Sequence, residues 1–94
     1  MSDYMGCIVR ANAGRDRGGI FCVVGTDRER LLLADGKRRK SARPKAKNPG
    51  HVQVLMDQRH GFDHPAIQKL KQGEALTDKE LRRALAAFRD QLEV

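Results

Sequence analysis

The sequence predicts a mainly β domain, a small closed or half-closed barrel, followed by two short α-helices. Three observations predict it. Short apolar runs in the first half are separated by turn residues. Apolar residues in the second half recur at helical spacing. A chain of 94 residues suffices for one small domain with a modest core. We place the barrel at residues 1–56 and a helical extension, packed on the barrel or on a partner, at residues 57–94.

Five strands are expected in the first part. The first three are β-branched or apolar runs at residues 6–11, 19–26 and 30–34. Asp35-Gly36 is typical of a type I′ hairpin turn, in which both central residues take positive φ. The basic segment after this turn is expected to continue as a fourth strand as far as Pro44. The alternating residues 51–55 form the fifth.

Two helices are expected in the second part. Pro65 suits a first helical position and Gly73 the position just past the helix end. Thr77 and Glu80 form a capping box for the second helix, and Leu76 with Leu81 forms the accompanying hydrophobic staple. One apolar stripe follows along the second helix, with Ala84 on its flank: Leu81, Leu85, Phe88 and Leu92.

The net positive charge belongs entirely to the first half of the chain. The net charge is +7, with a sequence pI near 10.0. Residues 1–51 hold 12 Lys/Arg against 5 Asp/Glu, whereas residues 52–94 hold 7 of each. The segment 37–47, KRRKSARPKAK, contains seven basic residues and no acidic one. Such an excess favours a polyanionic partner such as nucleic acid or an acidic membrane surface. The alternative is a solvated or flexible charged face.

The stretch NAGRDRGG, residues 12–19, connects the first two expected strands. Its glycines permit positive φ and the close approach of another molecule, and Arg15 and Arg17 suit phosphate oxygens. Asp16 would be repelled by phosphate, so we expect it to hydrogen-bond the loop backbone or to hold an arginine. The alternative is a solvated hairpin loop that happens to be charged.

The segment GCIVRANAGRDRGGIFCVVG resembles a KOW motif. The continuation LLLADGKRRKSARPKAKNPGH is similar to bacterial KOW-domain RNA-binding proteins related to archaeal- and eukaryotic-type large-subunit ribosomal proteins. An Asp-Gly turn, spaced basic residues, a Pro-Lys element and a histidine carry this similarity: Asp35, Gly36, Arg39, Pro44, Lys45, Lys47 and His51. The resemblance covers about residues 4–52. Two features depart from the pattern, because Arg17 stands for the commoner lysine and residues 48–50 for further lysines.

The resemblance implies an SH3-like barrel that binds RNA, ribosomal RNA in particular. Residues of the glycine loop would face the RNA: Gly14, Arg15, Asp16, Arg17 and Gly18. The basic segment would add further phosphate contacts: Lys37, Arg38, Arg39, Lys40, Arg43, Lys45 and Lys47. The chain has no Trp, one Tyr and three Phe, of which Phe21 and Phe88 are expected in the core. We therefore expect recognition of RNA backbone and shape, because base stacking needs exposed aromatic rings.

No catalytic motif is recognisable, so the protein is expected not to be an enzyme, and neither cofactor nor metal is expected. His60 and His64 are separated by Gly61 and followed by Pro65, which does not suit a metal-binding helix. Cys7 and Cys22 are expected to be buried thiols, although a tight pairing of the first strands could place them opposite each other. A disulfide therefore stays open.

The longest uninterrupted apolar run, residues 20–24, is far shorter than a membrane span. With no apparent signal peptide, a cytoplasmic protein is expected. Two rival interpretations stay open beside RNA binding. One is an SH3-like protein-interaction module in a transcription or translation complex, with the C-terminal helices recruiting a protein partner. The other is a protein associated nonspecifically with DNA.

Overall fold

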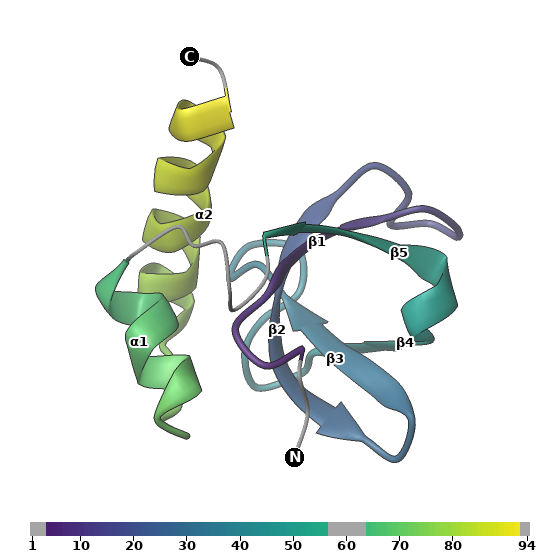
Figure 1. Ribbon diagram of the computed structural model, residues 1–94, viewed down its shortest axis with the longest axis horizontal. Helices are drawn as coiled ribbons and strands as arrows, with labels where there is room; N and C mark the ends of the chain where they lie inside the picture. Colours follow the sequence, from purple (N-terminus) through teal and green to yellow (C-terminus); the bar gives the residue numbers. More distant parts are fainter. Residues whose placement is uncertain (1–3, 57–63, 93–94) are drawn as a thin grey trace.

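The computed structural model describes residues 4–56 and 64–92. It contains a five-stranded antiparallel sheet with the strand order β4-β3-β2-β1-β5, and two C-terminal helices (Figure 1). The fold is thus mainly β with C-terminal helices, as expected. The elements are β1 (Ile8–Ala11), β2 (Ile20–Asp27), β3 (Arg30–Ala34), β4 (Lys45–Lys47), the single 3-10 turn η1 (Pro49–His51), β5 (Val52–Met56), α1 (Pro65–Lys71) and α2 (Asp78–Leu92).

The sheet is strongly curved, with β2 in the middle between β3 and β1 (Figure 1). Ile8 pairs with Cys22 of β2 on one side and with Met56 of β5 on the other. The outermost strands β4 and β5 are joined through η1. Among the described residues, no ladder between β4 and β5 closes the sheet into a complete barrel.

The fourth strand was predicted wrongly. Residues 36–44 form bends and turns, and the strand is limited to Lys45–Lys47. The type I′ hairpin at Asp35-Gly36 is also wrong, because these residues open a long loop. The physical reason is the Asp35 carboxylate, whose Oδ1 accepts hydrogen bonds from the N–H groups of Lys37, Arg38 and Arg39, each at 2.9 Å. These donors are therefore withdrawn from sheet pairing. The fifth strand is displaced by one residue, since His51 belongs to η1.

Alternate residues of the central strands enter two separate apolar layers, as the pleat of a β-strand requires. Val9 and Phe21 lie in the layer enclosed by the curved sheet, whereas Ile8 and Cys22 lie in the layer between the sheet and the helices. Ile67, Leu70 and further helix residues complete this second layer. The helices are therefore packed on the sheet through a continuous core.

Both helix starts and the first helix end agree with the sequence. Pro65 is the first residue of α1, and Gly73 after its end has φ +84°. Thr77 Oγ1 accepts from the Glu80 N–H at 3.1 Å, and Glu80 Oε1 accepts from the Thr77 N–H at 3.1 Å. This reciprocal capping box begins α2. No helix in residues 4–56 and 64–92 is long and apolar enough to cross a membrane.

The apolar stripe of α2 is buried along most of its length but not at its C-terminal end. Leu81, Leu85 and Phe88 are buried, and so is Ala84. Leu92 has the spacing of this stripe but is 52% exposed, so the buried part of the stripe ends at Phe88. Lys69 Nζ donates to Glu80 Oε2 at 2.7 Å and joins α1 to α2. This bond and the Thr77 contacts lower the pKa of Glu80 to about 2.

Cys7 and Cys22 are both buried and are not joined by a disulfide. They lie on opposite sides of the sheet, Cys7 in the enclosed layer and Cys22 in the helix-facing layer. Since side chains of successive strand positions point to opposite faces, the pairing of Ile8 with Cys22 turns Cys7 away. The possible disulfide is therefore not formed. Burial, with a smaller effect of Cys7, raises the pKa of Cys22 to about 12.

Candidate nucleic-acid interface

The glycine-rich loop between β1 and β2 is a compact turn held by its own backbone. The N–H groups of Arg17, Gly18 and Gly19 donate to the carbonyls of Gly14, Ala11 and Asp16 at 3.2, 2.8 and 2.8 Å. Gly14 and Gly18 have φ +78° and +86°, which glycine adopts without strain. Arg15 and Arg17 are exposed, and Asp16 between them is buried. The turn thus presents two arginines and withdraws the carboxylate.

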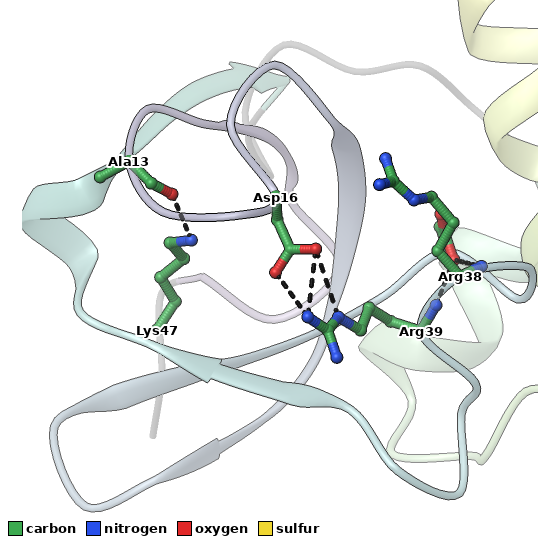
Figure 2. A network of polar contacts seen from close by, with 6 residues as sticks. Ala13, Asp16, Arg38, Arg39 and Lys47 are labelled. Carbon is green, nitrogen blue, oxygen red and sulfur yellow. Dashed lines mark hydrogen bonds and ion pairs between the residues drawn. The ribbon is translucent and has the colours of Figure 1, made fainter.

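Asp16 holds an arginine, one of the two roles expected for it, but the arginine is Arg39 of the basic segment. Arg39 Nη2 lies 3.0 Å from Oδ2 and 3.2 Å from Oδ1, and Nε lies 3.3 Å from Oδ1 (Figure 2). Asp16 is 4% exposed. Burial raises the pKa of this carboxyl, but the hydrogen bonds and charge of Arg39, with Lys47 and Lys45, outweigh burial and leave the pKa below its ordinary value. Asp16 is therefore a charged link between two loops.

A second link ties the glycine loop to β4. Lys47 is buried, and its Nζ donates to the Ala13 carbonyl at 2.7 Å (Figure 2). A Cβ on Gly14 would lie 3.4 Å from this ammonium, so the glycine leaves space directly above it. The glycine loop is thus held at one end by Lys47 and in its middle by Arg39.

The start of α2 holds the basic segment from its other side. Arg82 Nη1 donates to the Gly36 carbonyl at 2.7 Å, and Asp78 Oδ1 accepts from the Ser41 N–H at 2.7 Å. Gly36 has φ +79°, and a Cβ there would overlap with the Asp78 carbonyl. The helical extension therefore helps to determine the conformation of the basic segment.

The structure divides the predicted RNA-contacting cations into two groups. Exposed cations are Arg15, Arg17, Lys37, Arg38, Lys40, Arg43 and Lys45. Arg39 and Lys47 are used within the protein, where they hold the glycine loop. The Asp16–Arg39 and Ala13–Lys47 contacts join the loop at residues 12–19 to the basic segment at two points.

Sequence reasoning missed the residues that fix the basic segment. Asp35, Asp78 and Arg82 act on its backbone through the bonds described above. An available signal was Asp35 followed by several non-proline residues, because an Asp side chain often caps the N–H groups that follow it. Nothing in the sequence indicated that Asp78 and Arg82 reach this loop.

The histidines within the described chain have structural neighbours or lie at the surface. His64 Nδ1 accepts from the Ala66 N–H at 3.1 Å and caps α1. His51 is exposed in η1, and His60 falls outside the described residues. Within residues 4–56 and 64–92, no group of three His, Cys, Asp or Glu residues is placed to hold a metal ion.

Comparison with known proteins gives no family assignment. No protein-family model matches the chain, and no curated protein sequence matches it.

Proposed function

We propose that the protein binds structured RNA, ribosomal RNA in particular, and acts in the cytoplasm in association with the ribosome or with translation. The observation that carries this proposal is the Asp16–Arg39 ion pair, which joins the arginine-bearing glycine loop to the basic segment. The role is one of binding, without catalysis.

The exposed cations of this region are left for an external anion. The Asp16 carboxylate is paired with Arg39, and Asp35 Oδ1 accepts hydrogen bonds from three backbone N–H groups. In the part of the chain that the structure describes, no ion pair involves Arg15, Arg17 or the exposed cations of residues 37–45. Phosphate groups of a nucleic-acid backbone would relieve the mutual repulsion of these charges.

The fold is compatible with an SH3-like barrel of the KOW type, which we propose as the class of this domain. The antiparallel order β4-β3-β2-β1-β5 and the 3-10 turn between β4 and β5 support it. The glycine loop lies between β1 and β2, where the resemblance expects the RNA-facing loop.

Recognition of backbone and shape is favoured over the stacking of bases. Phe21 and Phe88 are 1% and 2% exposed, and both belong to the core. Tyr4 is half-buried against the enclosed apolar layer. In the described residues, no fully exposed aromatic ring offers a stacking surface. Phosphates and the shape of a folded RNA are then the features that the cations can read.

The test is binding to labelled fragments of the source organism's ribosomal RNA over a range of salt concentrations. Arg15→Gln combined with Arg17→Gln is expected to weaken binding and to reduce the salt slope by about 2, one for each lost phosphate contact. The matched control is Arg83→Gln with Arg89→Gln, which removes the same charge from exposed positions of α2. Equal affinities of the two folded variants would refute the loop as the RNA contact.

Gradient fractionation of cell lysate tests the ribosomal part of the proposal. Co-migration with the large ribosomal subunit, lost after nuclease treatment, is expected. A position that nuclease does not change would instead favour the protein-interaction module. Equal affinity for duplex DNA and structured RNA would favour a nonspecific nucleic-acid-binding protein.

A further inference from the structure

A concave surface lies between the glycine loop, the start of β3, β4 and η1. It encloses about 380 Å³ and is lined by Ala13, Gly14, Arg30, Ala46, Lys47, Asn48 and His51. The volume falls in the range of small-ligand pockets, so a nucleotide-sized group fits. Its lining includes three basic side chains, Arg30, Lys47 and His51, together with the side-chain amide of Asn48, and no carboxylate.

Lys47 is the buried cation of this cleft. The residue is 8% exposed, and its Nζ donates to the Ala13 carbonyl at 2.7 Å. Among the described residues, Lys47 forms no ion pair, although its charge acts on the nearby Asp16, which is paired with Arg39. An ammonium has three N–H donors, and a buried charge is costly unless it is paired. An anion entering the cleft could accept a hydrogen bond from this ammonium and would bring a negative charge into direct contact with it.

Gly14 lines the same cleft beside this ammonium. Gly14 is exposed, and its missing side chain would stand within 3.4 Å of Nζ. At the other border Arg30 is exposed, and its contact with Asp27 is a loose one of 4.0 Å between side chains that are 56% and 57% exposed. Such exposed pairs are weak, so Arg30 can turn toward an anion at little cost.

We propose that this cleft holds a phosphodiester group of the bound RNA, with Lys47, Arg30 and His51 as its donors. This inference rests on the proposed RNA-binding function. It adds Arg30 and His51, which lie outside the basic segment, and the buried Lys47 to the residues that contact RNA. The RNA backbone then contacts both the exposed arginines of the glycine loop and the cleft. Gly14 serves as the point of close approach between them.

The test compares Arg28, in the turn between β2 and β3, with Arg30, the first residue of β3. Arg30→Gln and Arg28→Gln each remove one exposed charge, two residues apart, but only Arg30 lines the cleft. With the labelled ribosomal RNA fragments, Arg30→Gln is expected to lower affinity about threefold to tenfold and the salt slope by about 1. Arg28→Gln is expected to leave both near the wild-type values. Urea unfolding of both variants verifies that each is folded.

Nuclear magnetic resonance of the full chain supplies a second measurement. The backbone amide of Gly14 and the ammonium of Lys47 are expected to shift when the RNA fragments are added. Equal effects of the two arginine variants would overturn the cleft as an RNA contact. Shifts with inorganic phosphate but none with RNA would assign the cleft to a free phosphate and overturn the inference as well.

The failure of this inference differs from the failure of the proposed function. If the Arg15 and Arg17 variant loses affinity while Arg30→Gln does not, only the cleft is refuted. If the wild-type protein binds none of the RNA fragments at any salt concentration, the RNA-binding function fails, and the cleft assignment fails with it.

Discussion

Asp16 and Arg39 are 23 residues apart in the chain, and their side chains form a bidentate ion pair with Nη2–oxygen distances of 3.0 and 3.2 Å. The Asp16 side chain is 6% exposed and the Arg39 side chain 32% exposed. The pair therefore lies at the boundary between core and solvent. There it fixes the relative position of the two loops that carry the exposed cations.

Loss of this ion pair is expected to destabilise the fold measurably. Asp16→Asn removes the charge and keeps the size of the side chain, leaving Arg39 with a weaker partner. A hydrogen bond to a charged group contributes about 1.5–3 kcal/mol, so a decrease of about 2 kcal/mol in the free energy of unfolding is expected. Urea unfolding measures it.

The matched control for Asp16→Asn is Asp27→Asn. Asp27 forms the exposed 4.0 Å pair with Arg30, and such surface pairs contribute about 0–1 kcal/mol. A control loss of less than about 0.5 kcal/mol is expected. If the two variants lose equal stability, the Asp16–Arg39 pair has no special role in holding the loops.

The contribution of Asp16 to stability is expected to depend on pH in one direction. Its pKa is lower in the folded protein than its ordinary value, in spite of burial, because of Arg39 and the nearby lysines. The folded state thus favours the ionised form. The resulting stability is fully present above about pH 5 and is lost as pH falls below about 4 through the lowered pKa.

Urea unfolding of wild type and Asp16→Asn across this pH range tests that dependence. The stability difference between them is expected to be constant near neutral pH and to shrink in acid, where both carry an uncharged group at position 16. A difference that grew on acidification would contradict the lowered pKa.

Gly36→Ala is expected to be far more costly than Gly73→Ala. Both glycines have positive φ, +79° and +84°. A methyl group at position 36 would overlap with the Asp78 carbonyl, whereas position 73 has no neighbour within 4 Å. The shared conformational cost is about 1–2 kcal/mol, and only Gly36→Ala adds the displacement of α2. Thermal unfolding of the two variants measures the difference. Equal losses of stability would show that α2 is not in close contact with the turn at Gly36.

Both cysteines are expected to resist thiol reagents in the folded protein. Cys7 and Cys22 are buried, and burial raises the pKa of the Cys22 thiol to about 12. The thiolate is the reactive form, so reaction near pH 8 requires unfolding. Mass spectrometry after treatment with a maleimide is expected to find both thiols unmodified without urea and both modified in it. Rapid modification of either residue under native conditions would contradict the burial of the two thiols in the apolar layers on either side of the sheet.

Local patterns predicted most of the secondary structure. The third strand has the predicted bounds, and both helix starts follow from Pro65 and the Thr77–Glu80 capping box. These signals are reliable because each depends on residues within four positions of one another. The capping of Lys37, Arg38 and Arg39 by Asp35 is equally local, yet it was missed because Asp-Gly also suits a hairpin.

The candidate site was predicted as a set of residues but not as an arrangement. The sequence alone determined the excess of positive charge in the first half, the glycine loop and the amphipathic α2, since composition and periodicity suffice for these. Only the tertiary structure decided that Arg39 and Lys47 bind the glycine loop and that Leu92 is exposed. It also decided that the two thiols lie on opposite sides of the sheet. The physical reason is that burial and partners far along the chain set the role of a charged or apolar side chain.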